Sequence, residues 1–201
     1  MLDKQVRIYN SRSSECFGDT GGIAAMELTP FHPRSPYAVG KSSAFWLVDN
    51  YREAYKLFVC TGILFNHESP YRPPRFVTQK IISTAKRIVN GSIEKLISGW
   101  LDISRDWGRA PEYVEAMWLM LQQDKAEDFV ISTGELNSLE DFVDTVFCQL
   151  GLNWKEHVVS NEEFMRPTDL AISFGDPSKA KKILGWQAQY KMRDVVSMMM
   201  V

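Results

Sequence analysis

The hydrophobic positions alternate between short apolar runs and longer amphipathic segments. The run at 57–65 (LFVCTGILF) and the run at 128–133 (DFVIST) are typical of strands buried on both faces, as in a parallel sheet. Shorter strands are predicted at 5–10 and 95–100. Strands that alternate with helical segments indicate an α/β fold.

Helical periodicity fills the segments between these runs. The pattern predicts helices at 36–55, 76–90, 110–123, 138–150, 176–184 and 192–200. Ser138 followed by Asp141 has the spacing of a capping box. For the helix at 176–184 we expect Asp176 as the cap and Pro177 in the first position. On the helix at 110–123, one apolar set has helical spacing and is expected in the core: Val114, Met117, Trp118 and Leu121.

Composition is that of an ordinary globular protein with one sizeable core. The chain has 201 residues, of which 45% are hydrophobic and 24% charged. The formal net charge of −2 does not indicate a nucleic-acid surface. The three cysteines, Cys16, Cys60 and Cys148, are far apart and form no CxxC pair. This pattern predicts a reducing compartment, with neither a disulfide framework nor a metal site.

Nothing in the sequence predicts an association with a membrane. The longest apolar run, at 57–65, is too short to span a bilayer. The N-terminal residues 1–4 do not have the pattern of a signal peptide. We therefore expect the protein to be cytoplasmic.

Candidate chemistry centres on the segment SPYAVGK at 35–41. Tyr37 and Lys41 are four residues apart, so they share one face of the predicted helix. An ammonium group beside a phenol favours the phenolate, which can take a proton from a substrate hydroxyl. Ser13 and Glu15 add a hydroxyl and a second acid–base group just after a predicted strand. Taken alone, the pair could be a chance spacing and the serines a plain turn.

A second polar cluster, Asn66-His67-Glu68, follows the buried run at 57–65. Ligand-binding residues of open α/β sheets lie just beyond the carboxyl ends of the strands. His67 could equally be a loop histidine with a satisfied hydrogen bond. Lys80 lies on the polar side of a helix, where it is either solvated or available to an anionic substrate. No glycine-rich phosphate loop follows the first strand.

These residues together resemble the GDP-mannose 4,6-dehydratases, a family within the extended short-chain dehydrogenase/reductase superfamily. The Tyr-Lys pair is shared by the superfamily, whereas NHESP at 66–70 and PRSPYAVGK at 33–41 are specific to this dehydratase. The remaining matches are SSECFG at 13–18, NYREAY at 50–55, FVTQKI at 76–81, RDWG at 105–108, YVEAMWLMLQQ at 113–123, EDFVISTG at 127–134 and GDPSKAKKILGW at 175–186.

The resemblance implies conversion of GDP-mannose to GDP-4-keto-6-deoxymannose with a recycled NADP. In that reaction Tyr37 takes the O4 proton and Ser13 hydrogen-bonds O4. Lys41 tunes the tyrosine and contacts the nicotinamide ribose, and Glu15 is the acid–base group at C5. Further binding roles are implied for His67 and Arg72 toward the cofactor, and for Asn66, Lys80, Arg105 and Arg166 toward the substrate, whose diphosphate an arginine can bind with two hydrogen bonds.

The resemblance implies a fold with two parts: a partial Rossmann-like parallel sheet and a small C-terminal α/β substrate-binding lobe. Residues 1–75 and 108–134 are assigned mainly to the sheet, and residues 76–107 and 135–201 mainly to the lobe. The family's glycine-rich cofactor-binding half lies before the first strand seen here, so we expect a truncated chain. Arg12 is a further departure, because the family has a small residue at this position.

The sequence leaves several hypotheses about function open. The first is the catalytic and substrate-binding portion of the dehydratase, with weak NADP binding and little turnover alone. The second is a non-catalytic subunit that joins a homo-oligomer or a complementing N-terminal half through an exposed sheet edge. The third is a remnant without function. Another nucleotide-sugar dehydratase or epimerase ranks lower, because those enzymes do not usually combine the two specific motifs.

Overall fold

The computed structural model describes residues 6–164 and 168–201. Its central sheet holds three parallel strands in the order β1-β2-β7, with bounds Ile8–Ser13, Val59–Leu64 and Phe129–Ile131. In register, Ser13 pairs with Leu64 and Leu64 pairs with Ile131. The carboxyl ends of the three strands therefore lie side by side, which confirms the predicted α/β fold.

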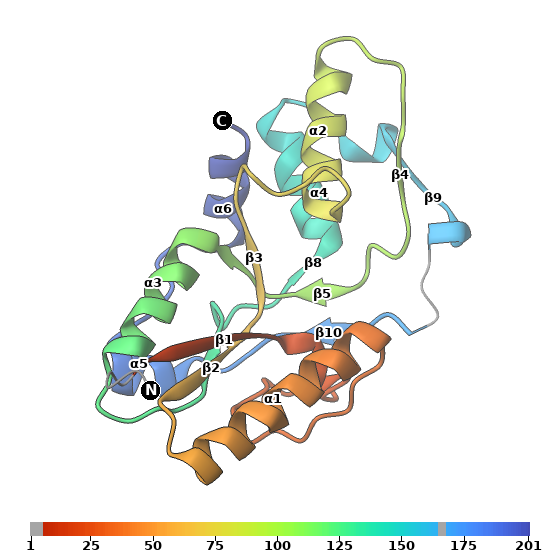
Figure 1. Cartoon of the computed structure of the whole chain (residues 1–201). Helices are drawn as coiled ribbons and strands as arrows, with labels where there is room; N and C mark the ends of the chain where they lie inside the picture. The colour runs from red at the N-terminus through yellow and green to blue at the C-terminus, as the bar shows by residue number, and fades with distance from the viewer. Residues whose placement is uncertain (1–5, 165–167) are drawn as a thin grey trace.

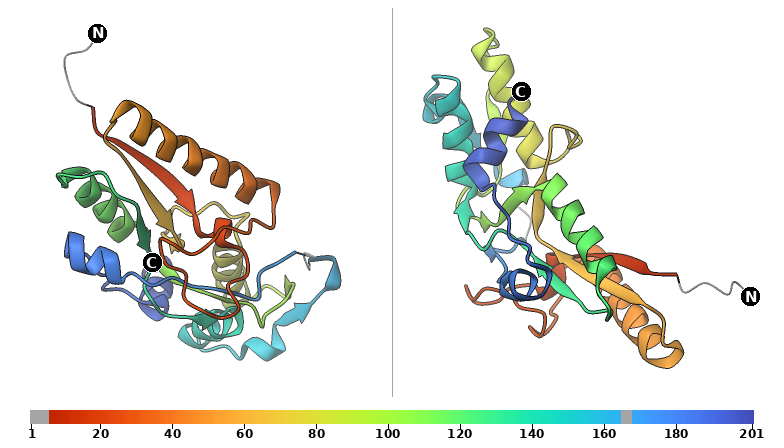
Figure 2. Two further views of the ribbon diagram at one scale, coloured as in Figure 1. Left: turned by 90° about the horizontal axis from the view of Figure 1, so that it is seen from below. Right: turned by 90° about the vertical axis from the view of Figure 1, so that its left-hand side faces the viewer.

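Helices cover both sides of this sheet (Figure 1). Helix α1 (Pro36–Tyr55) lies along one side of β1 and β2, and α3 (Ala110–Gln122) lies on the other (Figure 2). Helix α5 (Ser178–Leu184) packs against α3 and β7. All six residues of β2 are buried, as the apolar run predicts. We call this sheet with α1, α3 and α5 the sheet layer.

A second core lies among α2 (Val77–Val89), α4 (Leu139–Gln149) and α6 (Met192–Met199). These helices gather at one end of the molecule (Figure 1). Their buried faces are built from Ile, Val, Leu, Phe, Met and Ala side chains. Beside them, β4 (Leu96–Ser98) pairs in parallel with β9 (Val158–Ser160). We call α2, α4 and α6 the helical cluster.

Short elements join the two regions. Strand β3 (Asn66–Glu68) runs parallel to β6 (Trp107–Arg109). Strand β5 (Ser104–Arg105) pairs with β10 (Ile172–Ser173) and, in the antiparallel sense, with β8 (Asn137–Ser138). Three 3-10 turns complete the elements: η1 (Ser14–Phe17), η2 (Trp154–Glu156) and η3 (Glu162–Phe164).

Two predicted boundaries were wrong. Strand β1 continues to Ser13 instead of ending at Asn10, because its whole length pairs with β2. Helix α5 begins at Ser178 with Pro177 as its N-cap residue, while the Asp176 carboxylate accepts a hydrogen bond from the Ser178 amide at 2.8 Å. The other helices begin and end within two residues of the predicted bounds.

The predicted core face of α3 was also wrong in part. Val114 and Trp118 are about 60% exposed, whereas Tyr113, Ala116 and Met120 are fully buried against the sheet. Both sets have helical spacing, so periodicity alone did not decide between them. Among the residues described here, no helix has the length and apolar character needed to cross a membrane.

Candidate active site

The end of β1 and the start of α1 are tied together by serine hydroxyls. Ser13 caps η1, and its Oγ accepts a hydrogen bond from the Glu15 amide at 3.3 Å. Ser35 caps α1, and its Oγ accepts from the Ala38 amide at 3.1 Å. The Ser35 hydroxyl also donates to Glu15 Oε2 at 3.4 Å. The Glu15 carboxylate is thereby held at the N-terminus of α1, where the helix dipole favours negative charge.

Tyr37 and Lys41 lie one turn apart near the start of α1, as their spacing predicts. The Lys41 Nζ is 5.9 Å from the centre of the Tyr37 ring. The same ammonium group donates to the Ser11 carbonyl of β1 at 3.0 Å. Tyr37 is 55% exposed. Its phenol is therefore available to a ligand, while Lys41 anchors this face of the helix to the sheet.

A pocket of about 120 Å³ collects residues from five distant segments. It brings together three of the predicted site residues, Glu15, Asn66 and Arg105. The rest of its lining is Ser14, Arg34, Ser35, Thr168, Asp169, Leu170 and Ser173. The combination of carboxylate, amide, hydroxyl and guanidinium groups suits a polar, anionic ligand. Among the residues described, Ser13, Tyr37 and Lys41 are not part of this lining.

Arg105 is the most constrained cation of this pocket. It forms an ion pair with Asp169 at 3.0 Å and donates to the Ser104 carbonyl at 2.9 Å. Burial lowers the pKa of the Arg105 guanidinium, and the carboxylates of Asp169 and Glu15 oppose that shift. A phosphate bound here would replace Asp169 as the partner of the Arg105 guanidinium, or would share the guanidinium with Asp169.

His67 and Arg72 lie outside this pocket. The His67 Nδ1 donates to the Phe65 carbonyl at 2.8 Å, and its ring stacks on Tyr113 at 4.9 Å. Burial lowers the pKa of His67 and so disfavours its charged form; in the neutral ring, with Nδ1 donating, Nε2 is the acceptor. Arg72 pairs with the buried Glu68 carboxylate at 3.2 Å. Burial raises the pKa of Glu68, while the charge of Arg72 opposes the rise.

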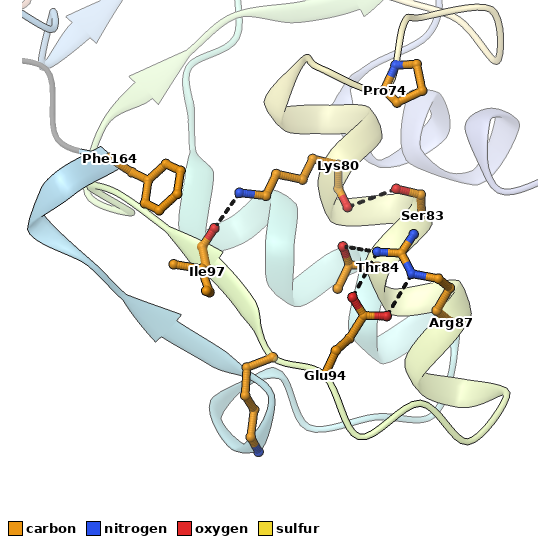
Figure 3. Close-up of a pocket in the computed structure, with 9 residues that line it drawn as sticks. Pro74, Lys80, Ser83, Thr84, Arg87, Glu94, Ile97 and Phe164 are labelled. Carbon is orange, nitrogen blue, oxygen red and sulfur yellow. Dashed lines mark hydrogen bonds and ion pairs between the residues drawn. The ribbon is translucent and has the colours of Figure 1, made fainter.

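Lys80 lies in a different pocket, of about 320 Å³, between α2 and β4 (Figure 3). Its Nζ donates to the Ile97 carbonyl at 2.7 Å and lies 4.6 Å from the centre of the Phe164 ring. Arg87, two turns further along α2, pairs with Glu94 at 2.7 Å. The pocket is otherwise lined by Pro74, Ser83, Thr84 and Lys95.

Sequence reasoning missed several residues that line the first pocket. Arg34 and Ser35 belong to the PRSPYAVGK motif, so the motif already contained a signal for them. No signal in the sequence pointed to Asp169 or Ser173, because these residues lie beside Arg105 only through the pairing of β10 with β5. The predicted site residue Arg166 lies outside the described residues.

Comparison with known proteins identifies the family. A model of GDP-mannose 4,6 dehydratase matches residues 1–199. The chain belongs to the GDP-mannose 4,6-dehydratase family. GDP-mannose 4,6 dehydratase 2 of Arabidopsis thaliana is 52% identical over 196 residues, which cover 98% of this chain and 52% of that protein. The human GDP-mannose 4,6 dehydratase is 43% identical, with 97% of this chain and 57% of that protein covered. The chain thus spans about half the length of these relatives.

Solved structures agree on the fold. RMD from Pseudomonas aeruginosa, complexed with NADPH, matches with a TM-score of 0.89 at 19% identity, over 98% of this chain and 66% of that one. A dTDP-glucose 4,6-dehydratase from Bacillus anthracis, in complex with NAD, matches with a TM-score of 0.86 at 20% identity, over 96% and 60%. These matches confirm the Rossmann-like fold expected from the sequence.

Proposed function

We propose that this chain carries the acid–base and substrate-binding machinery of a GDP-mannose 4,6-dehydratase. The observation that carries the proposal is the pocket in which Glu15, Asn66 and Arg105 meet beside the N-terminus of α1, in a chain that belongs to this family. A nucleotide-sugar diphosphate needs cationic and amide donors at one end and acid–base groups at the other. The pocket and the neighbouring Tyr37-Lys41 pair supply both kinds of group.

Substrate binding in this proposal rests on Arg105 and Asn66. The guanidinium of Arg105 offers paired N–H donors to a diphosphate, and Asn66 adds an amide donor. Asp169 holds Arg105 in place until phosphate oxygens take over its hydrogen bonds. Lys80, in the separate pocket between α2 and β4, is kept as a further predicted substrate contact; its present acceptor is the Ile97 carbonyl. Arg166 is kept as a further predicted diphosphate ligand.

Proton transfer rests on three groups near the end of β1. The exposed side chain of Tyr37, as its phenolate, takes the proton from the sugar O4, and the Ser13 hydroxyl hydrogen-bonds the same oxygen. Glu15 removes the proton at C5 and donates a proton to the C6 hydroxyl, which leaves as water. The hydrogen bond from Ser35 to Glu15 orients the carboxylate for this role.

NADP is the cofactor we propose, with Tyr37, Lys41, His67 and Arg72 as its contacts in this chain. When bound, it supplies a hydride acceptor for C4 and returns the hydride at C6. These polar groups suit the nicotinamide–ribose end, because the Lys41 ammonium is a donor and Nε2 of a neutral His67 is an acceptor. The sequence has no G-x-G-x-x-G turn for the pyrophosphate, so we expect this chain to bind NADP weakly.

Calorimetric titration of the purified chain tests the proposal. We expect heat of binding with GDP-mannose, a much weaker response with UDP-glucose, and a weak one with NADP. The Glu15→Gln variant should keep GDP-mannose affinity and lose any 4-keto-6-deoxy product formed with NADP present. Equal binding of GDP-mannose and UDP-glucose would favour another nucleotide-sugar dehydratase or epimerase instead.

A non-catalytic role is the second candidate. The observation in its favour is the apolar surface of α1, where Val39, Leu47, Tyr51 and Tyr55 are exposed. Such a surface suits a second copy of this chain or a complementing half. Sedimentation of the free chain separates the readings: a subunit role requires association, and substrate binding by a monomer contradicts it.

A further inference from the structure

Arg12 is a buried cation directly before Ser13 on β1. Its side chain is 1% exposed, although arginine is almost never fully buried without a partner. Its Nε, Nη1 and Nη2 atoms have no hydrogen-bond acceptor among the residues described. Burial lowers the pKa of this guanidinium, as expected for a cation removed from water, while the neighbouring Cys16 side chain and the charge of Asp128 oppose the shift. Something other than an ion pair must offset the cost of burying it.

Three phenylalanine rings surround the guanidinium. Its central carbon is 3.2 Å from the centre of the Phe31 ring, 4.3 Å from Phe45 and 5.9 Å from Phe17. Phe31 contacts both other rings edge to face, at 5.1 Å from Phe45 and 5.7 Å from Phe17. A cation held over aromatic faces and away from water gains more than the same contact at the surface. We call these three rings the aromatic cage.

Each ring of the cage belongs to a different segment of the candidate site. Phe17 ends η1, which carries Glu15. Phe31 lies in the loop that leads to Ser35, the cap of α1. Phe45 lies on α1 itself, one turn after Lys41. Arg12 therefore contacts every segment that brings an acid–base residue to the end of β1.

We infer that Arg12 is a positioning residue that clamps η1, the 18–35 loop and α1 onto the end of β1. An effect of Arg12 on turnover rests on the function proposed above, whereas the clamp is independent of that function. A methionine of similar length would fill the same space without the cost of a buried charge. It would lack the attraction that draws the three rings toward one point.

Hydrogen exchange measured by mass spectrometry on the whole 201-residue chain tests the clamp. In Arg12→Met we expect amides in residues 14–17 and 31–41 to exchange about tenfold faster, the scale of one desolvated cation–π contact. Exchange in α4 should stay at the wild-type rate. Arg12→Lys keeps a cation inside the cage and should remain within about threefold of wild type.

The matched control is Arg7→Met. Arg7 also stacks on a phenylalanine, with its guanidinium 4.5 Å from the Phe58 ring, at the opposite end of β1. It should leave residues 14–17 and 31–41 unchanged. Unchanged exchange in Arg12→Met, or equal acceleration throughout the chain, would overturn the clamp. So would Arg12→Lys exchanging as fast as Arg12→Met.

The same experiment separates the clamp from the proposed function. GDP-mannose added to the wild-type chain should slow exchange around Asn66 and Arg105 if the pocket binds it. Absence of that protection counts against the proposed function only, because the clamp is measured without ligand.

Discussion

The helical cluster and the sheet layer bury very different kinds of side chain. The helical cluster buries apolar side chains such as Ile81, Phe142 and Val196, and its buried polar residues are the threonines 78, 84 and 145. The sheet layer and the short elements that join the two regions bury the charged residues Arg12, Glu68, Asp106 and Glu112. Apolar burial stabilises by roughly 25 cal/mol per Å², whereas buried charges cost free energy unless they are paired. Both regions therefore have an apolar core, but among the described residues the buried charges lie outside the helical cluster.

Of the changes that test this comparison, we expect the largest effect from truncating a buried side chain of the helical cluster. We expect Phe142→Ala to lower the free energy of unfolding by roughly 3–5 kcal/mol, because it removes a fully buried ring and leaves a cavity. Urea denaturation followed by circular dichroism measures this. The exposed Trp118→Ala in the sheet layer is the control, with a change below about 1 kcal/mol. Equal losses would mean that the buried ring of Phe142 contributes no more to stability than an exposed ring.

Asp106 should make stability depend on pH. Burial raises the pKa of Asp106 to about 6, against opposing hydrogen bonds from the Thr133 and Gly134 amides and the charge of Lys191. The folded state thus binds a proton more tightly than the unfolded chain. The contribution of Asp106 to stability is fully present below about pH 4 and is lost as the pH rises through about 6, by about 3 kcal/mol.

The measurement is the free energy of unfolding between pH 4 and 7, with Asp106→Asn as the variant. Its slope should be flatter than that of wild type, although it loses one amide hydrogen bond. Asp124→Asn, at an exposed position, should keep the wild-type slope. A wild-type slope in Asp106→Asn would show that another group is responsible.

Substitutions of Arg105 and Arg87 compare the two pockets as candidate sites for the substrate's diphosphate. Arg105→Met should weaken GDP-mannose binding by about 10- to 100-fold, the loss of charged hydrogen bonds to phosphate. Arg87→Met removes a cation whose partner is Glu94 in the second pocket, and should weaken binding less than threefold. Calorimetry distinguishes the two variants. If Arg87→Met weakened binding more than Arg105→Met, the diphosphate would be assigned to the Lys80 pocket instead.

The smallest effect concerns two helix caps. Ser138 caps α4 with a full capping box, and Ser35 caps α1. Replacing either by alanine should cost about 1 kcal/mol of stability. Only Ser35→Ala should also reduce turnover, because its hydroxyl donates to Glu15. Thermal unfolding with an activity assay separates these outcomes, and a loss of activity in Ser138→Ala would argue against a purely structural cap.

Much of the fold could be predicted because its signals are local. Helix α1 begins and ends as predicted, since Pro36 suits the first turn and the amphipathic pattern ends at Tyr55. The apolar run at 57–65 contains β2, which is buried along its whole length. The nearness of Tyr37 and Lys41 follows from helical spacing alone.

The sequence by itself determined the helices, the strands β1, β2, β4 and β7, the family and the residues that could do acid–base chemistry, because spacing and capping act between neighbours. Tertiary structure decided which groups meet: it brought Asp169 to Arg105 and turned Val114 and Trp118 outward. It also enclosed Arg12 in the aromatic cage. Contacts across long sequence separations depend on how the layers pack, and periodicity within one segment carries no information about that packing.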